Sequence, residues 1–497
     1  MSDPLAELQD RAGEIHSLRA ITRLLEWDQL TLMPRAAAHH RADHLALLSR
    51  LEHRLLVDPE LERLLDAAER AAEALEPESD AAALVRLVRR EHTKAVRVPI
   101  ALREEMVAGA AEAKVIWQEA RARSDFDFFL PQLERTFDLR RRYVACFDST
   151  DDAYDVVLDD FEPDLTTCDV TRLFDEVKSE LVPLIAELRD RDDGAALSGP
   201  FPVEAQMRLS AEIVAVLGYR PGTWRLDPTA HPFSSGAGID DIRITTHYDE
   251  RTLGSFFATA HEFGHGLYEH QIPTRFAHLP IGAGWRSGLH ESQSRLWENL
   301  VCRSLPFWRF FYPRLQEHFP DRFRRLELER FYAAINAVRP SLIRIHADEV
   351  TYPMHVVLRF ELERSLLDGD AEVRDLPQLW ADKMQAYLGV EVPDDARGVL
   401  QDIHWAWGLI GYFPTYLLGS VMAVQIWEQA AAEIGDLEEQ VERGAFETLR
   451  EWLGESIHAH GRKLTPQEIL ERATGSRIST RPYLDYLAAK YRTAVAA

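Results

Sequence analysis

Three residues in the stretch Thr252–His270 have the types and spacing of a metal site. His261 and His265 lie four positions apart, and Glu262 follows the first of them. The mostly apolar pattern around them predicts a helix, on which side chains four residues apart lie one above the other. The imidazoles would then bind one tetrahedral zinc ion, with Glu262 as general base toward a water. The alternative is a pair of hydrogen-bonded core histidines, in an apolar helix where unbound polar groups are costly.

A catalytic zinc site needs a third protein ligand and one open position. Glu291 is the strongest candidate, because it lies 26 residues after the second histidine on another predicted helix. Arg295 and Glu298 would share its helix face and orient the carboxylate. His290 is the rival ligand, and its other possible roles are an outer hydrogen-bond donor or a core residue. Cobalt or manganese would also suit a site of nitrogen and oxygen ligands.

Five short motifs occur in one order between residues 241 and 405. They are Asp241-Ile-Arg-Ile-Thr245, His261-Glu-Phe-Gly-His265, His290-Glu-Ser-Gln293, Ile343-Arg-Ile-His-Ala-Asp348 and Gly398-Val-Leu-Gln-Asp-Ile-His-Trp405. In this combination the sequence resembles the M32 family of metallocarboxypeptidases, the thermostable carboxypeptidase Taq type. The similarity extends from Trp27-Asp28 to the C-terminal tail. It implies a mainly α-helical, gluzincin-type metallopeptidase with a deep central cleft, broad residue preference and a homodimeric state.

Two arginines are candidates for binding the free carboxylate of a peptide C-terminus. The planar guanidinium group matches two carboxylate oxygens, which favours Arg344, with Arg243 as the second possibility. The resemblance supports an exopeptidase role for the motifs that contain them. Each also has a structural interpretation. Arg344 could form a buried i,i+4 pair with Asp348, and Arg243 could pair with Asp240 or Asp241.

Three further residues could stabilise negative charge on the carbonyl oxygen during hydrolysis. His404, Tyr412 and Tyr416 carry N–H or O–H donors suited to that role. A histidine followed twelve residues later by a tyrosine also resembles oligopeptidases related to this family, which favours His404 and Tyr416. Any of the three could instead be a buried polar residue with a backbone partner.

The surrounding elements must place these residues together. Residues 1–150 are dense in Ala, Leu, Glu and Arg and predict successive amphipathic helices. We interpret the whole chain as one peptidase unit, with 1–200 as a helical lid or dimer surface and 201–497 as the zinc site and substrate groove. Ile239–Tyr248 alternates like a short strand, whose free edge could pair with a peptide, whereas Phe233–Gly238 resembles a loop. We also expect a helix over the Arg344–Tyr352 segment.

Composition excludes several other classes of protein. The formal net charge is −25, from 82 acidic and 57 basic residues, which disfavours nucleic acid or an anionic membrane as partner. Three cysteines are too few for a disulfide framework and fit a reducing compartment. The first residues lack a secretory signal, so the cytoplasm is expected. Ile403–Trp427 has no charged residue and could span a bilayer, but its Gly, Pro, His and Gln residues favour an interior wall.

These observations predict a zinc-dependent carboxypeptidase that releases single amino acids from peptide C-termini. The substrates would be peptides with a free C-terminus, and one divalent ion per chain would be the only cofactor. A zinc endo-oligopeptidase is the first alternative, because it would share the metal site. A non-catalytic peptide-binding protein is the second, although an intact Glu262 argues against it. A membrane metallopeptidase depends only on the uncharged run described above.

Overall fold

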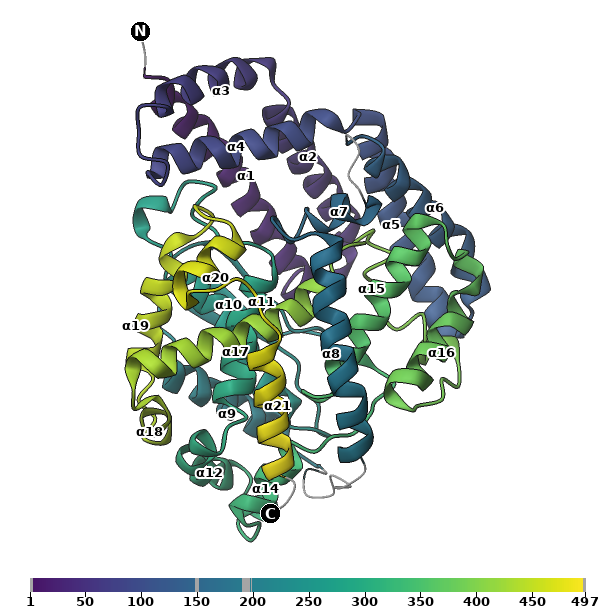
Figure 1. The fold of residues 1–497 in the computed structure, drawn as a ribbon, viewed down its shortest axis with the longest axis vertical. Coiled ribbons are helices and arrows are strands. Elements are labelled where there is room, and N and C mark those ends of the chain that lie inside the picture. The colour runs from purple at the N-terminus through teal and green to yellow at the C-terminus, as the bar shows by residue number, and fades with distance from the viewer. Residues whose placement is uncertain (1–2, 148–151, 190–196, 198, 495–497) are drawn as a thin grey trace.

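The computed structural model describes residues 3–147, 152–189, 197 and 199–494, and it is dominated by helices (Figure 1). This confirms the predicted mainly α fold with a small β element. The α-helices are α1 (Pro4–Thr31), α2 (Ala38–Leu56), α3 (Pro59–Ala72), α4 (Asp80–Arg97), α5 (Ile100–Arg123), α6 (Phe126–Val144), α7 (Ala153–Leu158), α8 (Thr167–Leu188), α9 (Val203–Leu217), α10 (Gly254–His270), α11 (Gly288–Arg295), α12 (Leu305–His318), α13 (Pro320–Phe323), α14 (Leu328–Ile335), α15 (Tyr352–Asp368), α16 (Leu376–Leu388), α17 (Pro414–Ile434), α18 (Leu437–Glu442), α19 (Glu447–Ser456), α20 (Pro466–Thr474) and α21 (Arg481–Ala494).

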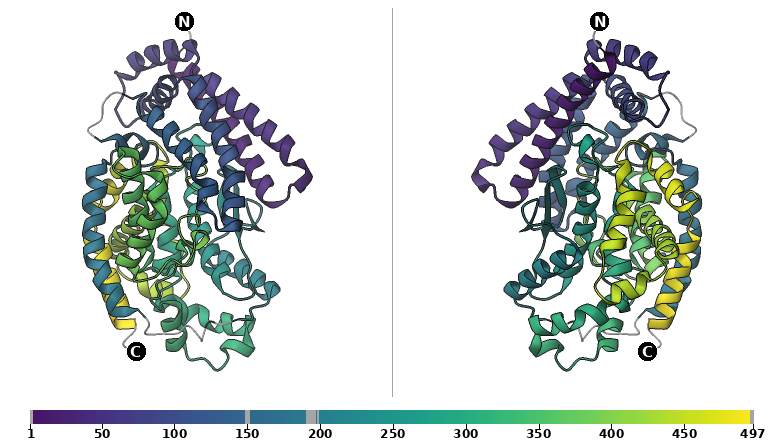
Figure 2. Two further views of the ribbon diagram at one scale, coloured as in Figure 1. Left: turned by 90° about the vertical axis from the view of Figure 1, so that its right-hand side faces the viewer. Right: turned by 90° about the vertical axis from the view of Figure 1, so that its left-hand side faces the viewer.

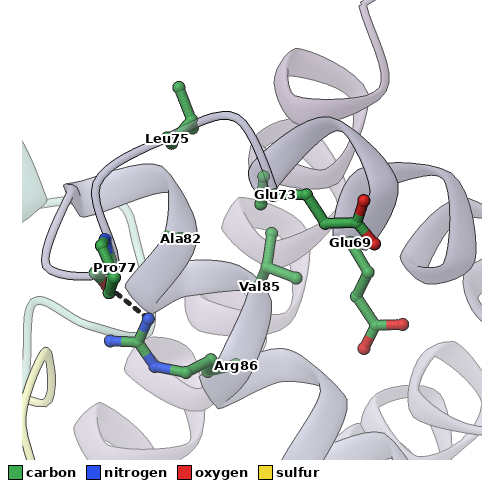
Figure 3. Close-up of a pocket in the computed structure, with 8 residues that line it drawn as sticks. Glu69, Glu73, Leu75, Pro77, Ala82, Val85 and Arg86 are labelled. Carbon is green, nitrogen blue, oxygen red and sulfur yellow. Dashed lines mark hydrogen bonds between the residues drawn. The ribbon is translucent and has the colours of Figure 1, made fainter.

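The first six helices form the N-terminal part, as their amphipathic pattern predicts. Helix α3 is an example, since it begins after an Asp58 cap and buries Leu61, Leu65 and Ala68 at helical spacing. Helices α1 and α2 pack together and stand away from the body of the molecule as a hairpin (Figure 2). A hollow between α3 and α4 is lined by charged and small apolar side chains such as Glu69 and Arg86 (Figure 3). None of the predicted site residues lines it.

The sheet has three strands, β1 (Trp224–Pro228), β2 (Ser234–Gly238) and β3 (Asp241–Thr246), in the order β1-β3-β2. Strand β3 pairs in parallel with β1 and antiparallel with β2. The expected strand therefore exists, but both of its edges are already paired, so the prediction that it offers a free edge is wrong. The expected loop at 233–238 is also wrong. Its Ser and Gly residues have low strand propensity, and pairing with β3 overrides that preference.

The interior is formed around α17, which contacts α11, α15, α20 and α21. Almost every residue of α17 from Pro414 to Ile426 is buried, which explains the absence of charge in this run and agrees with an interior wall. The helix begins only at Pro414, and the preceding segment Gln401–Phe413 has no regular helix or strand. Within the described part of the chain, no helix has both the length and the apolar character needed to cross a bilayer.

Candidate metal centre

Helices α10 and α11 bring the three predicted metal ligands together. His261, His265 and Glu291 each offer a ligand atom, and these atoms all lie within 4.8 Å of one another. The Nε2 atoms of His261 and His265 are 3.8 and 3.5 Å from Oε2 of Glu291. The two imidazoles are partly exposed and the carboxylate is almost buried. His290 does not belong to this group.

Glycines permit the close helix packing that this geometry requires. A Cβ atom on Gly264 of α10 would collide with the backbone of Gln293 in α11. A Cβ atom on Gly419 of α17 would lie 2.5 Å from the Cβ atom of Glu291. Helix α11 is therefore held tightly between α10 and α17, and its Ser287 cap accepts a hydrogen bond from the N–H of Leu289.

The predicted orienting residues Arg295 and Glu298 do contact the ligands. Arg295 Nε donates to Oε1 of Glu291 over 2.8 Å, which leaves Oε2 toward the imidazoles. Glu298 Oε2 lies 2.9 Å from Nδ1 of His261. A carboxylate on one ring nitrogen fixes the tautomer and leaves Nε2 free as a ligand. Glu298 in turn lies 3.3 Å from Arg295.

His265 is oriented by a second histidine rather than by a carboxylate. Its Nδ1 atom lies 2.6 Å from Nδ1 of His290, and Nε2 of His290 lies 3.0 Å from Oε1 of Glu269. With Nε2 of His265 free for a metal, its Nδ1–H donates to His290, whose Nε2–H donates to Glu269. Glu269 also accepts the N–H of Gly284. The rival ligand is thus an outer hydrogen-bond partner.

The donor set fits a divalent metal ion. Both imidazoles have Nδ1 occupied and Nε2 directed toward the same carboxylate oxygen. Burial lowers the pKa of His265 to about 4, so this ring is neutral and able to ligate. Burial alone would raise the pKa of Glu291, but Arg295, His261 and His265 together outweigh it and lower the pKa well below its ordinary value, so the group is ionised. Two imidazoles and one carboxylate are three protein ligands, the number that a catalytic zinc site has and one fewer than a structural site has.

Glu262 has the properties of a general base. Its Oε2 atom is buried and has no hydrogen-bond partner in the described part of the structure. Burial raises its pKa to about 7, close to the pH at which proton transfer in both directions is most effective. The residue follows the first ligand on α10. We name this group, with His261, His265 and Glu291, the metal side.

His404, Tyr412 and Tyr416 also come together, although the segment between them is irregular. Nε2 of His404 lies 3.1 Å from the hydroxyl of Tyr416, and its ring is stacked 5.9 Å from that of Tyr412. The pKa of Tyr412 is raised to about 12 by burial and by the charge of Glu291, which places it near the metal ligands. We name residues 401–413 together with Tyr416 the loop side.

The two arginines both have carboxylate partners inside the protein. Arg344 is buried and donates through Nε and Nη2 to Asp402, over 3.1 and 2.9 Å. The alternative Arg344–Asp348 pair is wrong, because Asp348 instead accepts backbone N–H groups, including those of Val350 and Thr351. The helix expected over this segment is also wrong, since only Arg344–His346 forms a short 3-10 helix and α15 begins at Tyr352. The Asp348 side chain instead holds a turn at residues 349–351, just before that start.

Arg243 forms an ion pair with Asp241, which is the structural role that the sequence allowed for it. It donates to Asp241 over 2.7 and 2.9 Å, and its guanidinium lies 4.2 Å from the ring centre of Trp27. Arg225 lies 4.7 Å from the same ring, so the indole of α1 contacts two cations of the sheet. Whether either arginine also binds substrate stays a prediction.

Several residues that hold the site were missed by sequence reasoning. Asp402 joins Arg344 to Arg359 of α15 through both of its oxygens. Asp402 belongs to the motif at residues 398–405, but nothing in the sequence indicates its two arginine partners. The carboxyl group of Glu162 accepts the N–H of Gly288 at the start of α11 over 2.5 Å, and no local pattern connects these two residues.

Comparison with known proteins agrees with this site. A family model described as Carboxypeptidase Taq (M32) metallopeptidase matches residues 7–491. Thermostable carboxypeptidase 1 of Thermus thermophilus is 42% identical over 500 residues, covering 98% of this chain and 97% of the relative. Carboxypeptidase 1 of Bacillus subtilis is 35% identical over 489 residues, with the same coverage. The crystal structure of an M32 carboxypeptidase from Deinococcus radiodurans aligns with a TM-score of 0.94 at 37% identity, covering 99% of this chain and 100% of that one.

Proposed function

Since this chain belongs to the Carboxypeptidase Taq (M32) metallopeptidase family and is a metallocarboxypeptidase, we propose that it releases single amino acids from peptide C-termini with a zinc ion held by His261, His265 and Glu291. The observation that carries the proposal is the convergence of these three ligand atoms within 4.8 Å, with both Nδ1 atoms already engaged. When bound, the ion polarises the scissile carbonyl and acidifies water. Cobalt or manganese would suit the same ligands.

Glu262 carries the proton in this mechanism. Its free Oε2 atom accepts a proton from the attacking water as the new C–O bond forms. When the C–N bond breaks, the same carboxyl group donates that proton to the departing amine. A pKa raised to about 7 by burial allows both transfers near neutral pH. The cycle returns Glu262 to its ionised form.

His404 and Tyr416 stabilise the negative charge that develops on the carbonyl oxygen, with Tyr412 as a further donor. Burial lowers the pKa of His404 to about 3, so its ring is a neutral donor at physiological pH. Its contact with the Tyr416 hydroxyl supports a joint role. The two groups act by donating hydrogen bonds and do not transfer the catalytic proton.

Arg344 is the favoured partner of the substrate's terminal carboxylate, with Arg243 as the second candidate. The Arg344 guanidinium lies 4.8 Å from the ring centre of Tyr416, which places its charge on the loop side. Asp402 and the Tyr352 hydroxyl orient it from behind. Arg243 lies on β3, where it pairs with Asp241 and stacks over the ring of Trp27 from α1. Neither of these contacts involves the loop side.

Digestion of one peptide in two forms tests this function. Metal-loaded protein should shorten the unblocked peptide stepwise from its C-terminus, read as a ladder by mass spectrometry, and should leave the C-terminal amide largely intact. Internal cuts in both forms would support the endo-oligopeptidase instead. Binding of both forms without any cleavage would support a non-catalytic peptide-binding protein. Metal analysis of the active preparation, after chelation and reloading with zinc, cobalt or manganese, identifies the effective ion.

The chain's organisation and setting belong to the same proposal. We place the protein in the cytoplasm as a homodimer. Each chain is one peptidase unit, in which residues 1–200 form a lid or dimer surface and residues 201–497 form the zinc site and substrate groove. The zinc site lies in a deep central cleft. The exposed apolar side chains of Leu30 and Leu32 at the end of the α1 hairpin support a partner surface there. The net charge of −25 argues against nucleic acid as a partner. Sedimentation of the wild type and of Leu30→Ser tests the dimer.

A further inference from the structure

The loop side has no regular backbone structure of its own to hold its functional groups. Residues 401–413 form turns only, such as those closed by the N–H groups of Trp407, Gly408 and Leu409. Repeating hydrogen bonds fix side-chain directions in helices and strands, and an irregular segment must be fixed by other contacts. His404 and Tyr412 lie near the two ends of this segment, so something outside it must set their separation.

The carboxyl group of Glu363 contacts the segment at both of those ends. Trp405 Nε1 donates to its Oε1 over 2.7 Å, and the N–H of Gly411 donates to its Oε2 over 3.0 Å. These two donors immediately follow His404 and immediately precede Tyr412. The Tyr154 hydroxyl of α7 is a third donor, over 2.6 Å. Glu363 itself lies on α15 and is fully buried.

Gly411 shows that this arrangement is demanding. Its φ is +93°, in the left-handed region that favours glycine. A Cβ atom there would lie 2.5 Å from the carbonyl oxygen of Val157. The backbone at Gly411 therefore packs closely against α7, and in this conformation its N–H points to the Glu363 carboxylate.

Burying the Glu363 carboxylate costs free energy that its partners must offset. Among the described residues, no Arg, Lys or His forms an ion pair with Glu363, so its desolvation is offset mainly by the three hydrogen bonds, with a smaller effect of the charge of Arg359. Burial raises its pKa to about 7 in spite of those donors. An apolar side chain would fill the same space at lower cost but would leave the Trp405 and Gly411 N–H groups unbonded.

We propose that Glu363 is a positioning residue for the peptidase reaction, which fixes His404 and Tyr412 by joining the two ends of the loop side to α15. The inference rests on the proposed function in that His404 acts on the reacting carbonyl. The described hydrogen bonds of Glu363 go to Tyr154, Trp405 and Gly411 and not to the metal ligands, so it acts through the geometry of residues 401–413. A displacement of about 1 Å at a reacting group lowers the rate by on the order of 100-fold.

The test compares Glu363→Gln with two variants that remove single donors. Glu363→Gln and Trp405→Phe should each lower kcat by about 10- to 100-fold, with KM and metal affinity within about 2-fold of the wild type. Tyr154→Phe removes a hydrogen bond to the same carboxyl group without touching the loop side. It should cost comparable stability in thermal unfolding but lower kcat by no more than about 3-fold. An equal loss of kcat in Tyr154→Phe would overturn the proposal.

A second pair of measurements separates positioning from a general structural role. In a His404→Ala, Tyr412→Phe background, Glu363→Gln should cause little further loss of kcat, because both groups being positioned are gone. A full, additive loss there contradicts the proposal. Hydrogen–deuterium exchange should rise in residues 401–413 of Glu363→Gln and stay unchanged in α11. Unchanged exchange in 401–413 would refute the positioning role even if the wild type cleaves no peptide, in which case the proposed function fails separately.

Discussion

His261, His265 and Glu291 lie on two regular helices, whereas His404 and Tyr412 lie on an irregular segment. On the metal side, helical geometry places the ligands and the packing of α10 on α11 brings them together. On the loop side, the same precision depends on buried carboxylates, Glu363 from α15 and Asp402 within the segment. A site can thus be half encoded in local spacing and half in contacts between distant segments.

The two sides also differ in the sign of their buried charge. Three carboxylates, those of Glu262, Glu291 and Glu298, lie in or beside the metal side, where Arg295 and Arg303 pair with the last two. On the loop side the ionised carboxylate of Asp402 faces two arginines, and burial raises the pKa of the Glu363 carboxyl group to about 7. An acidic pocket attracts a metal cation, while a cationic one suits a peptide carboxylate and a developing oxyanion. We expect this asymmetry to orient a substrate between the two sides.

Glu262→Gln tests the metal side most strongly. Gln has nearly the same shape but cannot accept and return a proton, so kcat should fall by about 100- to 10,000-fold. Metal affinity should stay within about 2-fold, because Glu262 is not in the ligand group. Steady-state kinetics on a peptide, with metal content measured on the same samples, gives both values. A residual kcat within 10-fold of the wild type would remove Glu262 from the proton transfer.

Asp402→Ala tests the loop side, and its effect should be on folding. The change leaves Arg344 and Arg359 buried without a counter-charge, which costs about 3–5 kcal/mol in the free energy of unfolding. Urea denaturation measures this. Glu105→Gln, which breaks an exposed ion pair with Arg142, is the matched control and should cost far less, because solvent screens that pair. Equal losses in the two variants would mean that burial of the Asp402 network contributes nothing special.

Glu162→Gln tests a second buried carboxyl group, for comparison with Glu363. Glu162 accepts one described hydrogen bond, whereas Glu363 accepts three. Burial raises the pKa of Glu162 to about 8, above its ordinary value of about 4.5. Between about pH 4.5 and pH 8, the Glu162 carboxyl group is ionised in the unfolded chain and protonated in the folded protein. The free energy of unfolding therefore falls as pH rises, by up to about 1.4 kcal/mol per pH unit, and levels off above pH 8.

The Gln variant should lack this part of the pH dependence. Urea titrations of wild type and variant between pH 5 and 8 give the difference, so other titrating groups cancel. A difference that does not change with pH would mean that Glu162 is ionised in the folded protein and is stabilised by the start of α11.

What the sequence could predict follows the same division. The spacing of His261 and His265, and of Glu291 with its neighbours, is a property of single helices, so it could be read before the fold was known. The sequence indicates His404 and Tyr416 as a pair but assigns no role to Asp402 or Glu363, because their side-chain partners across the fold lie 42 or more residues away along the chain. Strand β2 was missed for a related reason. Its Ser and Gly residues adopt a strand only because β3 is available to pair with them.

His290→Ala has the smallest expected effect and addresses the weakest point of the metal side. His261 is oriented by a carboxylate, whereas His265 depends on a second histidine, His290, which Glu269 holds in turn. Loss of such an outer partner lowers metal affinity by about 10- to 100-fold, because the ligand ring can then rotate and adopt the other tautomer.

Competition with a chelating dye measures this affinity, and saturating metal should restore most of kcat. His270→Ala is the control, since His270 also lies on α10 but bonds only to the backbone oxygen of Ile239. It should leave the affinity within about 2-fold. If His290→Ala binds metal as tightly as this control, packing of α10 against α11 alone is enough to direct His265. The metal side would then be set entirely by regular helices, and its contrast with the loop side would be sharper than the outer hydrogen bonds suggest.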